Sequence, residues 1–110
     1  MTEVVVLSSK LITRKYGDDG PTFHEHWCPG CEQTHVIAVV QPFRNGARWT
    51  FDGNAEAPTF SPSINIGPGT PLQCHYFIRA GQIDFCGDSR HALAGKIVPM
   101  PDIPERCLEP

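Results

Sequence analysis

The feature of the sequence with the clearest chemical potential is the segment Cys28-Pro29-Gly30-Cys31. Proline followed by glycine suits the middle of a tight turn, which would place both thiols on one side with backbone N–H groups near the sulfurs. Zinc in proteins prefers a tetrahedron of thiolate and imidazole ligands, and such a turn supplies two of them. The alternatives are inert thiols and a redox pair, which would need a helix beginning at the first cysteine. Because a strand-like stretch follows, the pattern favours a metal site.

The other ligands of such a site have to come from distant parts of the chain. Within a strand, Cys74 and His75 would point to opposite faces, so both could bind one ion only if Cys74 lies in a bend before the strand begins. The upstream segment Pro71-Leu72-Gln73 is compatible with such a bend. The further side chains of suitable type are Cys86, His91, His24, His26 and His35.

These further side chains also have structural interpretations. A lone cysteine such as Cys86 is more often an apolar filler or an exposed thiol than a ligand. His24 and His26 are spaced two residues apart on an expected strand, which favours a solvated surface for both. His91 could simply pair with Asp88 across one turn. The cysteine pair therefore remains the strongest part of the prediction.

The familiar catalytic motifs are absent. A zinc deaminase has Pro before its Cys-x-x-Cys, whereas Trp27 precedes Cys28 here. His-Glu-x-x-His, Gly-x-Ser-x-Gly and a phosphate-binding glycine loop do not occur. A catalytic zinc would need an open coordination position and a nearby acid or base such as Glu32, Asp84 or Asp88. No pattern supports that arrangement, so we assign no catalytic residue and favour a role without catalysis, while the sequence leaves the question open.

The elements that must position these residues are expected to be short strands. The 110 residues include 11 Pro and 10 Gly, which excludes a long helix bundle. We predict a mainly β fold: a small single-domain β-sandwich or partly open barrel with a zinc-knuckle turn and at most one short helix, at 90–94. The domain would span residues 1–98, followed by a Pro-rich extended tail at 99–110. Alternating and β-branched runs predict strands at 3–7, 10–14, 22–27, 34–40, 48–51, 58–66, 74–79 and 82–85.

Two details of these strands bear on the site. Two prolines of the same parity in the strand 58–66 predict an edge strand. A two-residue loop at Ala80-Gly81 would set Ile78 opposite Ile83 and keep the apolar face consistent. A three-residue loop would suit Ala80 better, because alanine disfavours a positive φ. The sequence leaves both registers open.

Composition and charge restrict the cellular setting. The formal charge is −3 and the basic residues are scattered, which argues against nucleic-acid binding. No apolar run is long enough for a membrane helix, and the first residues lack a signal-peptide pattern. An odd number of cysteines, five, is typical of a compartment that keeps thiols reduced. We therefore expect a soluble cytoplasmic protein without a membrane partner.

Four sequence blocks, at 26–31, 49–64, 74–81 and 88–95, occur in this order along the chain. Together they resemble a family of small uncharacterised phage and prophage proteins. Some members carry an ammonia monooxygenase label that nothing in this sequence supports. The resemblance covers roughly residues 22–102 and implies a phage-encoded protein in the bacterial host cytosol, without implying a reaction. It places the cysteine pair in the first block, a Cys-His pair in the third and His91 in the last.

Together these observations predict a small zinc-binding accessory protein with a structural metal site. Its function would be to bind a host or phage protein through its surface. The alternatives are a small metal-dependent hydrolase with an open zinc position and a zinc-ribbon-like nucleic-acid-binding module. Bound Zn²⁺ would tie a loop to a distant strand and stabilise a core rich in turns. The expected ligands are Cys28, Cys31, Cys74 and His75, with His91 as the main alternative for one of the last two.

Overall fold

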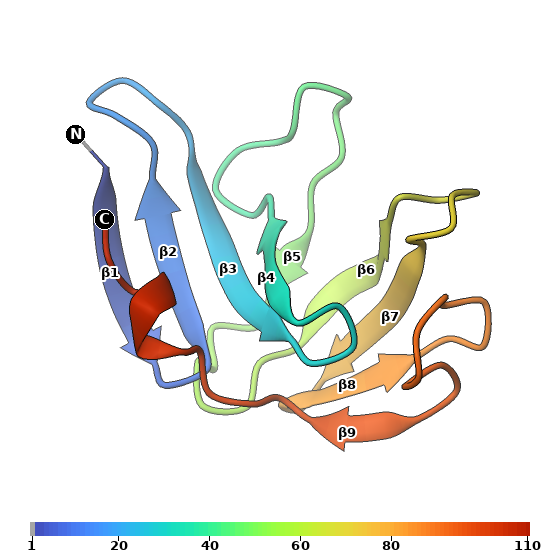
Figure 1. Ribbon diagram of the computed structural model, residues 1–110. Helices are drawn as coiled ribbons and strands as arrows, with labels where there is room; N and C mark the ends of the chain where they lie inside the picture. The colour runs from blue at the N-terminus through green and yellow to red at the C-terminus, as the bar shows by residue number, and fades with distance from the viewer. Residues whose placement is uncertain (1) are drawn as a thin grey trace.

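The computed structural model describes residues 2–110, which form two antiparallel sheets (Figure 1). The first sheet has the order β1 (Glu3–Ser8), β2 (Leu11–Lys15), β3 (Thr22–Cys28) and β4 (Gln33–Ile37). The second has the order β5 (Thr50–Phe51), β6 (Phe60–Ile66), β7 (Cys74–Arg79), β8 (Gln82–Phe85) and β9 (Ile97–Pro99). The prediction of a mainly β fold is confirmed, and neither sheet closes into a barrel.

Helical structure is confined to one short segment of the described residues. This is the 3-10 helix η1 (Glu105–Cys107), whereas the helix predicted at 90–94 is a series of turns. No helix in the described part of the chain has the length and apolar character needed to cross a membrane.

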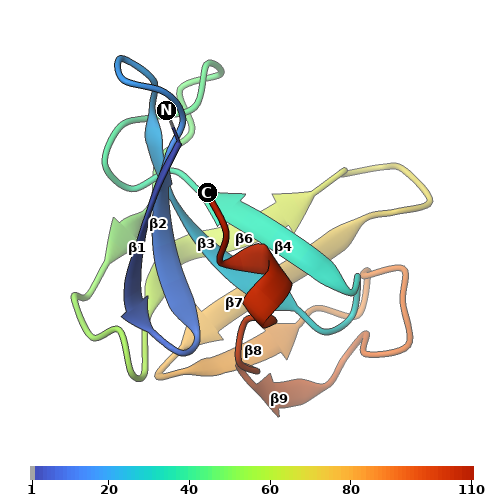
Figure 2. The same cartoon turned by 60° about the vertical axis from the view of Figure 1, so that its left-hand side comes forward.

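The core lies between the two sheets, with β3 and β4 facing β6 and β7 (Figures 1 and 2). Successive side chains of a strand point to opposite faces, so β7 buries Cys74, Tyr76 and Ile78 while His75 lies on the outer face of the second sheet. Burial of the apolar inner face is the main stabilising contribution. Other buried core side chains are Leu11, Ile37, Phe60, Ile64, Ile83 and Phe85.

The β7–β8 hairpin adopts the two-residue loop. Ile78 lies opposite Ile83, and both loop residues have positive φ: 48° at Ala80 and 77° at Gly81. A left-handed conformation at alanine costs about 1–2 kcal/mol. The alternative register would move the apolar side chains of β8 to solvent, which is a larger loss. The apolar pattern therefore outweighs the turn preference of Ala80.

Strand β6 is not an edge strand, so that prediction was wrong. It lies between β5 and β7, although β5 pairs only with Phe60 and Ser61. Two more residues lie between Phe60 and Ile64 than between their partners on β7, which makes the intervening segment a bulge. Bulges redirect side chains locally. The indole N–H of Trp49 donates to the carbonyl of Ser63 at 3.2 Å and holds the end of this bulge.

The segment 99–110, expected to be an extended tail, runs from β9 to the first sheet (Figure 2). Ile103 is buried, and its backbone N–H donates to the carbonyl of Ser9 at 2.9 Å. The guanidinium of Arg14 on β2 donates to the carbonyls of Cys107 and Glu109. These contacts attach the segment to the first sheet.

Candidate functional site

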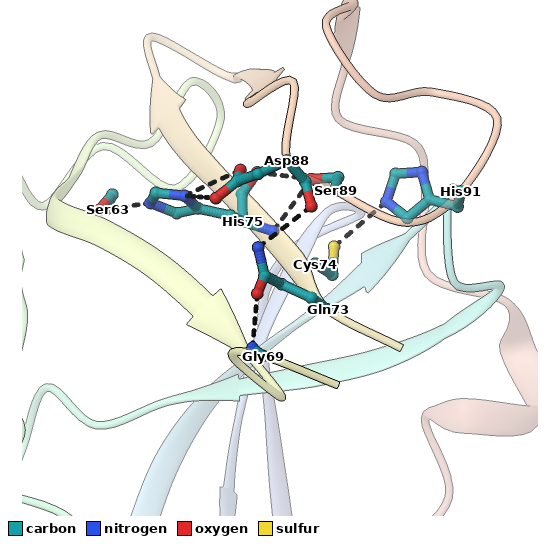
Figure 3. Close-up of polar contacts among 8 residues, drawn as sticks. All are labelled: Ser63, Gly69, Gln73, Cys74, His75, Asp88, Ser89 and His91. Carbon is teal, nitrogen blue, oxygen red and sulfur yellow. Dashed lines mark hydrogen bonds and ion pairs between the residues drawn. The ribbon is translucent and has the colours of Figure 1, made fainter. Parts of the chain in front are cut away.

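One cluster of thiols and an imidazole lies between the sheets. Cys28 ends β3, Cys31 follows in the turn to β4, Cys74 begins β7 and His91 lies in the turns after β8. Their ligand atoms all lie within 4.8 Å of one another. The sulfur of Cys74 is 3.8 Å from that of Cys28. It is also 3.3 Å from Nε2 of His91, a contact that Figure 3 shows. All five cysteines are free thiols, so this cluster can bind a metal ion.

The local structure of the Cys28-to-Cys31 turn shapes this cluster. The backbone N–H of Cys31 points at the sulfur of Cys28 at 3.4 Å, and Glu32 closes the turn by donating to the carbonyl of Cys28. A side chain at Gly30 would place its Cβ 2.3–2.6 Å from three ring atoms of His91. Glycine is therefore required here because the imidazole of His91 packs directly on the turn.

The thiols of the cluster strongly influence one another. A hydrogen bond from the Cys74 thiol, helped by the backbone N–H groups of Cys31 and Gly30, lowers the pKa of Cys28 to about 6 against the opposing effect of burial. The same hydrogen bond and burial raise the pKa of Cys74. Burial and the neighbouring Cys28 raise the pKa of Cys31. Without a cation only one of the three sulfurs readily ionises, whereas a divalent ion would favour the thiolate form of all three.

The structure does not bring His75 into this cluster. Cys74 is already the first residue of β7 and pairs with Ile66 on β6, so no bend precedes His75. Consecutive strand residues point to opposite faces, and the side chain of His75 therefore lies on the far side of the sheet from the sulfur of Cys74. The fourth position near the three sulfurs is held by His91.

A second polar arrangement lies on the outer face of the second sheet. Nε2 of His75 is 3.1 Å from the hydroxyl oxygen of Ser63, and Nδ1 is 3.2 Å from both carboxylate oxygens of Asp88 (Figure 3). With its proton on Nδ1, His75 donates to Asp88 and accepts from the Ser63 hydroxyl at Nε2. A hydroxyl, a base and a carboxylate that orients the base form the arrangement that activates a serine nucleophile.

Three different elements supply this arrangement. Ser63 lies in the β6 bulge, His75 on β7, and Asp88 in the turn after β8. Side-chain exposure is 25% for His75 and 54% for Asp88, so the site opens to solvent. Ser63 is also partly exposed, so all three side chains are accessible from the solvent.

Hydrogen bonds attach the Asp88 turn to β7. The hydroxyl of Ser89 accepts from the backbone N–H of His75 at 3.0 Å and donates to its carbonyl at 2.9 Å. The side-chain amide of Gln73 donates to the carbonyl of Asp88 and accepts from the backbone N–H of Gly69 (Figure 3). The separation of Asp88 from His75 is thus set by both the backbone and neighbouring side chains.

The expectation of a solvated surface for His24 and His26 was wrong. Both are buried, as is His35, because the second sheet covers the inner face of β3 and β4. The hydroxyl of Tyr76 lies 2.7 Å from Nε2 of His26 and 3.0 Å from Nδ1 of His35. Burial lowers the pKa of His26 to about 3 and that of His35 to about 4, so both rings are neutral at neutral pH.

Sequence reasoning did not single out Ser63. It considered Asp88 only as a partner of His91 or an acid near a metal, whereas Asp88 pairs with His75. The order and spacing of Ser63, His75 and Asp88 match no local motif, because such arrangements are defined by geometry and not by sequence position. One signal for the outer site was present in the sequence: alternation along the strand places the side chain of His75 on the face opposite that of Cys74.

Comparison with known proteins identifies a family. The family model described as bacterial ubiquitination-like system serine protease (BubE) matches residues 3–86. The matched range contains Ser63 and His75 and ends two residues before Asp88. No curated protein and no solved structure matches the chain.

This match overturns the expected function. The expected role as a phage accessory protein was wrong, and so were the alternatives of a metal-dependent hydrolase and a nucleic-acid-binding module, because the matched family is one of serine proteases. The expected capacity to bind a metal ion is retained, because the cluster of Cys28, Cys31, Cys74 and His91 can hold one. The resemblance to a small family is supported only at the level of a bacterial family, and the match contains nothing about phage origin. Since the matched range spans most of the chain, the protein belongs to the BubE family of bacterial ubiquitination-like system serine proteases.

Proposed function

We propose that this protein is a serine protease in which Ser63, His75 and Asp88 form the catalytic triad. The observation that carries the proposal is the continuous hydrogen-bonded chain from the Ser63 hydroxyl through both ring nitrogens of His75 to the Asp88 carboxylate. Family membership independently supports a serine nucleophile. The sulfur-rich cluster lies on the other face of the sheet and takes no part in the chemistry.

Each residue of the triad has a distinct role. The Ser63 hydroxyl oxygen attacks the carbonyl carbon of the scissile bond while Nε2 of His75 takes the hydroxyl proton. Asp88 accepts the Nδ1 hydrogen bond, holds the required tautomer and stabilises the imidazolium. His75 then returns the proton to the leaving group, and an acyl-enzyme remains. Water, deprotonated by the same ring, attacks this ester and restores the Ser63 hydroxyl.

The substrates we propose are proteins of a ubiquitination-like system. The family description names such a system, and a protease acting within it requires protein partners. The exposure of His75 and Asp88 supports a macromolecular substrate, because an extended chain can lie across an open face. The bond cleaved would be an acyl bond at the carboxyl end of a ubiquitin-like modifier, either in its precursor or in its conjugates.

Labelling with a fluorophosphonate tests the nucleophile without knowledge of the substrate. We expect labelling of the wild-type protein and of Ser61→Ala, which changes an exposed serine in the same bulge, but not of Ser63→Ala. Hydrolysis of a ubiquitin-like precursor should fall roughly 10⁴-fold or more in Ser63→Ala. Persistent labelling of Ser63→Ala, or the absence of labelling in the folded wild-type protein, would contradict the proposed triad.

We also propose that Zn²⁺ occupies the cluster of Cys28, Cys31, Cys74 and His91. Three thiols and an imidazole are the ligand set of closed structural zinc sites, in which no open position remains for a substrate. The ion would connect the β3–β4 turn to β7 and to the turns after β8. From the inner face of the second sheet, it would thereby stabilise the strand and the turn that carry His75 and Asp88.

Elemental analysis tests this second proposal. We expect about one zinc per wild-type chain, retention of zinc in Cys107→Ser, and loss of zinc in Cys28→Ser. Loss of the ion should lower the free energy of unfolding by about 3 kcal/mol or more, which corresponds to a fall in Tm of about 10–20 °C. Equal zinc content in the two variants would rule out this ligand set.

A further inference from the structure

Cys86 lies beside the proposed triad without a role in it. Its backbone N–H donates to the carbonyl of His75 at 2.8 Å, which places it across from His75 where the chain leaves β8. Ligand atoms of Cys86, His75 and Asp88 all lie within 4.8 Å of one another. The sulfur therefore lies next to the pair of side chains that would activate Ser63.

These three side chains have the chemistry of a zinc site. Thiolate, imidazole and carboxylate bind zinc at about 2.0–2.3 Å, so two ligands of a tetrahedral ion lie roughly 3.3–3.8 Å apart. The present separations would have to shrink by about 1.5 Å at most. Nδ1 of His75 and the carboxylate oxygens of Asp88 are already 3.2 Å apart, so only the distances to the Cys86 sulfur have to shorten. Three protein ligands leave the fourth position of the ion to water.

We propose that Cys86, His75 and Asp88 form an inhibitory zinc site, distinct from the buried cluster, through which free Zn²⁺ switches the protease off. This inference rests on the proposed triad. The ion takes the place of the proton that Nδ1 of His75 shares with Asp88. That proton leaves to solvent while Nε2 takes one up, so the ring stays neutral, and the Cys86 thiol releases its own proton to solvent. A neutral imidazole bound through Nδ1 carries its proton on Nε2, so it cannot accept the proton of Ser63.

The two zinc sites differ in expected affinity. The buried cluster offers three sulfurs, whereas the outer site offers one sulfur and a half-exposed carboxylate. The buried cluster should therefore fill first, and the outer site should bind the second equivalent reversibly.

Binding can be measured without catalysis in the Ser63→Ala protein, in which all three outer ligands are intact. The protein is first loaded with one zinc equivalent, and a second equivalent of Zn²⁺ is then titrated by calorimetry. We expect a second binding event that weakens at least 10-fold when Cys86→Ser is added, and equally when Cys86→Ala is added. Addition of Cys107→Ser serves as the matched control and should leave the second event unchanged.

Inhibition is then measured on the zinc-loaded protein with an intact triad. Cys86→Ser should retain the basal rate of hydrolysis and require at least 10-fold more free Zn²⁺ for half-inhibition than wild type or Cys107→Ser. A second binding event that is missing, or that does not depend on Cys86, overturns the zinc site. Cys86-dependent binding to a protein that shows neither hydrolysis nor fluorophosphonate labelling would instead refute the proposed protease while retaining the metal site.

Discussion

The two faces of strand β7 carry two different kinds of site. On the inner face, Cys74 belongs to a buried cluster of three thiols and an imidazole. On the outer face, the adjacent His75 belongs to an open hydrogen-bonded arrangement with Ser63 and Asp88. Because successive side chains of a strand point to opposite faces, Cys74 and His75 belong to different sites although they are adjacent in the sequence. This alternation also explains why no single ion at the inner cluster could bind both of them.

The two sites nevertheless share their supports. Both take one residue from β7 and one from the turns after β8, where Asp88 and His91 are three residues apart. Ser89 lies between them and bonds to both backbone groups of His75. Substitutions in the outer site should therefore reduce hydrolysis without changing stability. Substitutions in the inner cluster should lower the free energy of unfolding first and reduce hydrolysis only as a consequence.

The variant expected to separate the two sites most clearly is Asp88→Asn, which should reduce hydrolysis and leave stability unchanged. The variant retains the shape of the turn but removes the charge that stabilises the imidazolium, so hydrolysis should fall by roughly 10²-fold or more. We expect less than for a buried aspartate, because Asp88 is partly screened by solvent. The content of zinc in the buried cluster and the Tm should not change. Asp102→Asn, at an exposed position, is the control, and equal rates for the two variants would remove Asp88 from the triad.

A substitution at Gly30 should produce the opposite pattern. The new Cβ in Gly30→Ala would overlap the His91 ring and displace it from Cys74. Zinc affinity, measured by competition with a chelator, should fall about 10–100-fold, and stability should fall by about 1–3 kcal/mol. Gly87→Ala is the matched control, since a Cβ there meets no atom within 4 Å. Unchanged zinc affinity in Gly30→Ala would show that His91 is not a ligand.

The smallest expected effect is on the stability of the fold at acidic pH, and it comes from His24 between the two sheets. Burial against Phe51 and Phe60 lowers the pKa of His24, so the unfolded chain binds a proton that the folded chain does not. Stability is therefore fully present above pH 6.5 and decreases as the pH falls towards the lowered value, by at most about 1.4 kcal/mol per pH unit. Urea unfolding between pH 7 and 5 should show a shallower decrease for His24→Leu. Parallel curves would contradict this contribution.

Much of the fold could be predicted from local patterns. Alternation and turn residues located every described strand except β9, and the Cys28-to-Cys31 turn identified the start of the inner cluster. The interior position of β6 could not be predicted, because its partner β5 is only two residues long. The burial of His24 and His26 also escaped prediction, since it depends on how one sheet covers the other.

The outer site was less accessible to sequence reasoning. Its serine depends on a bulge whose two additional residues follow from pairing with β7 and not from the local sequence. Its aspartate lies in a turn that is placed by Gln73 and Ser89 through contacts between distant positions. Cysteine is rare and binds metals, so its spacing is informative about a site, whereas the position of one serine among many is not. Chemistry assembled from common residues requires the three-dimensional structure.

The inner cluster has a consequence for the order of folding. The two sulfurs of Cys28 and Cys74 are 46 residues apart in the chain and belong to different sheets. Closing so long a loop is slow compared with forming a hairpin, so each sheet can form before the four ligands meet. Tight metal uptake should then be the last step of refolding. The rate at which a refolding chain takes up zinc would report the docking of one sheet on the other.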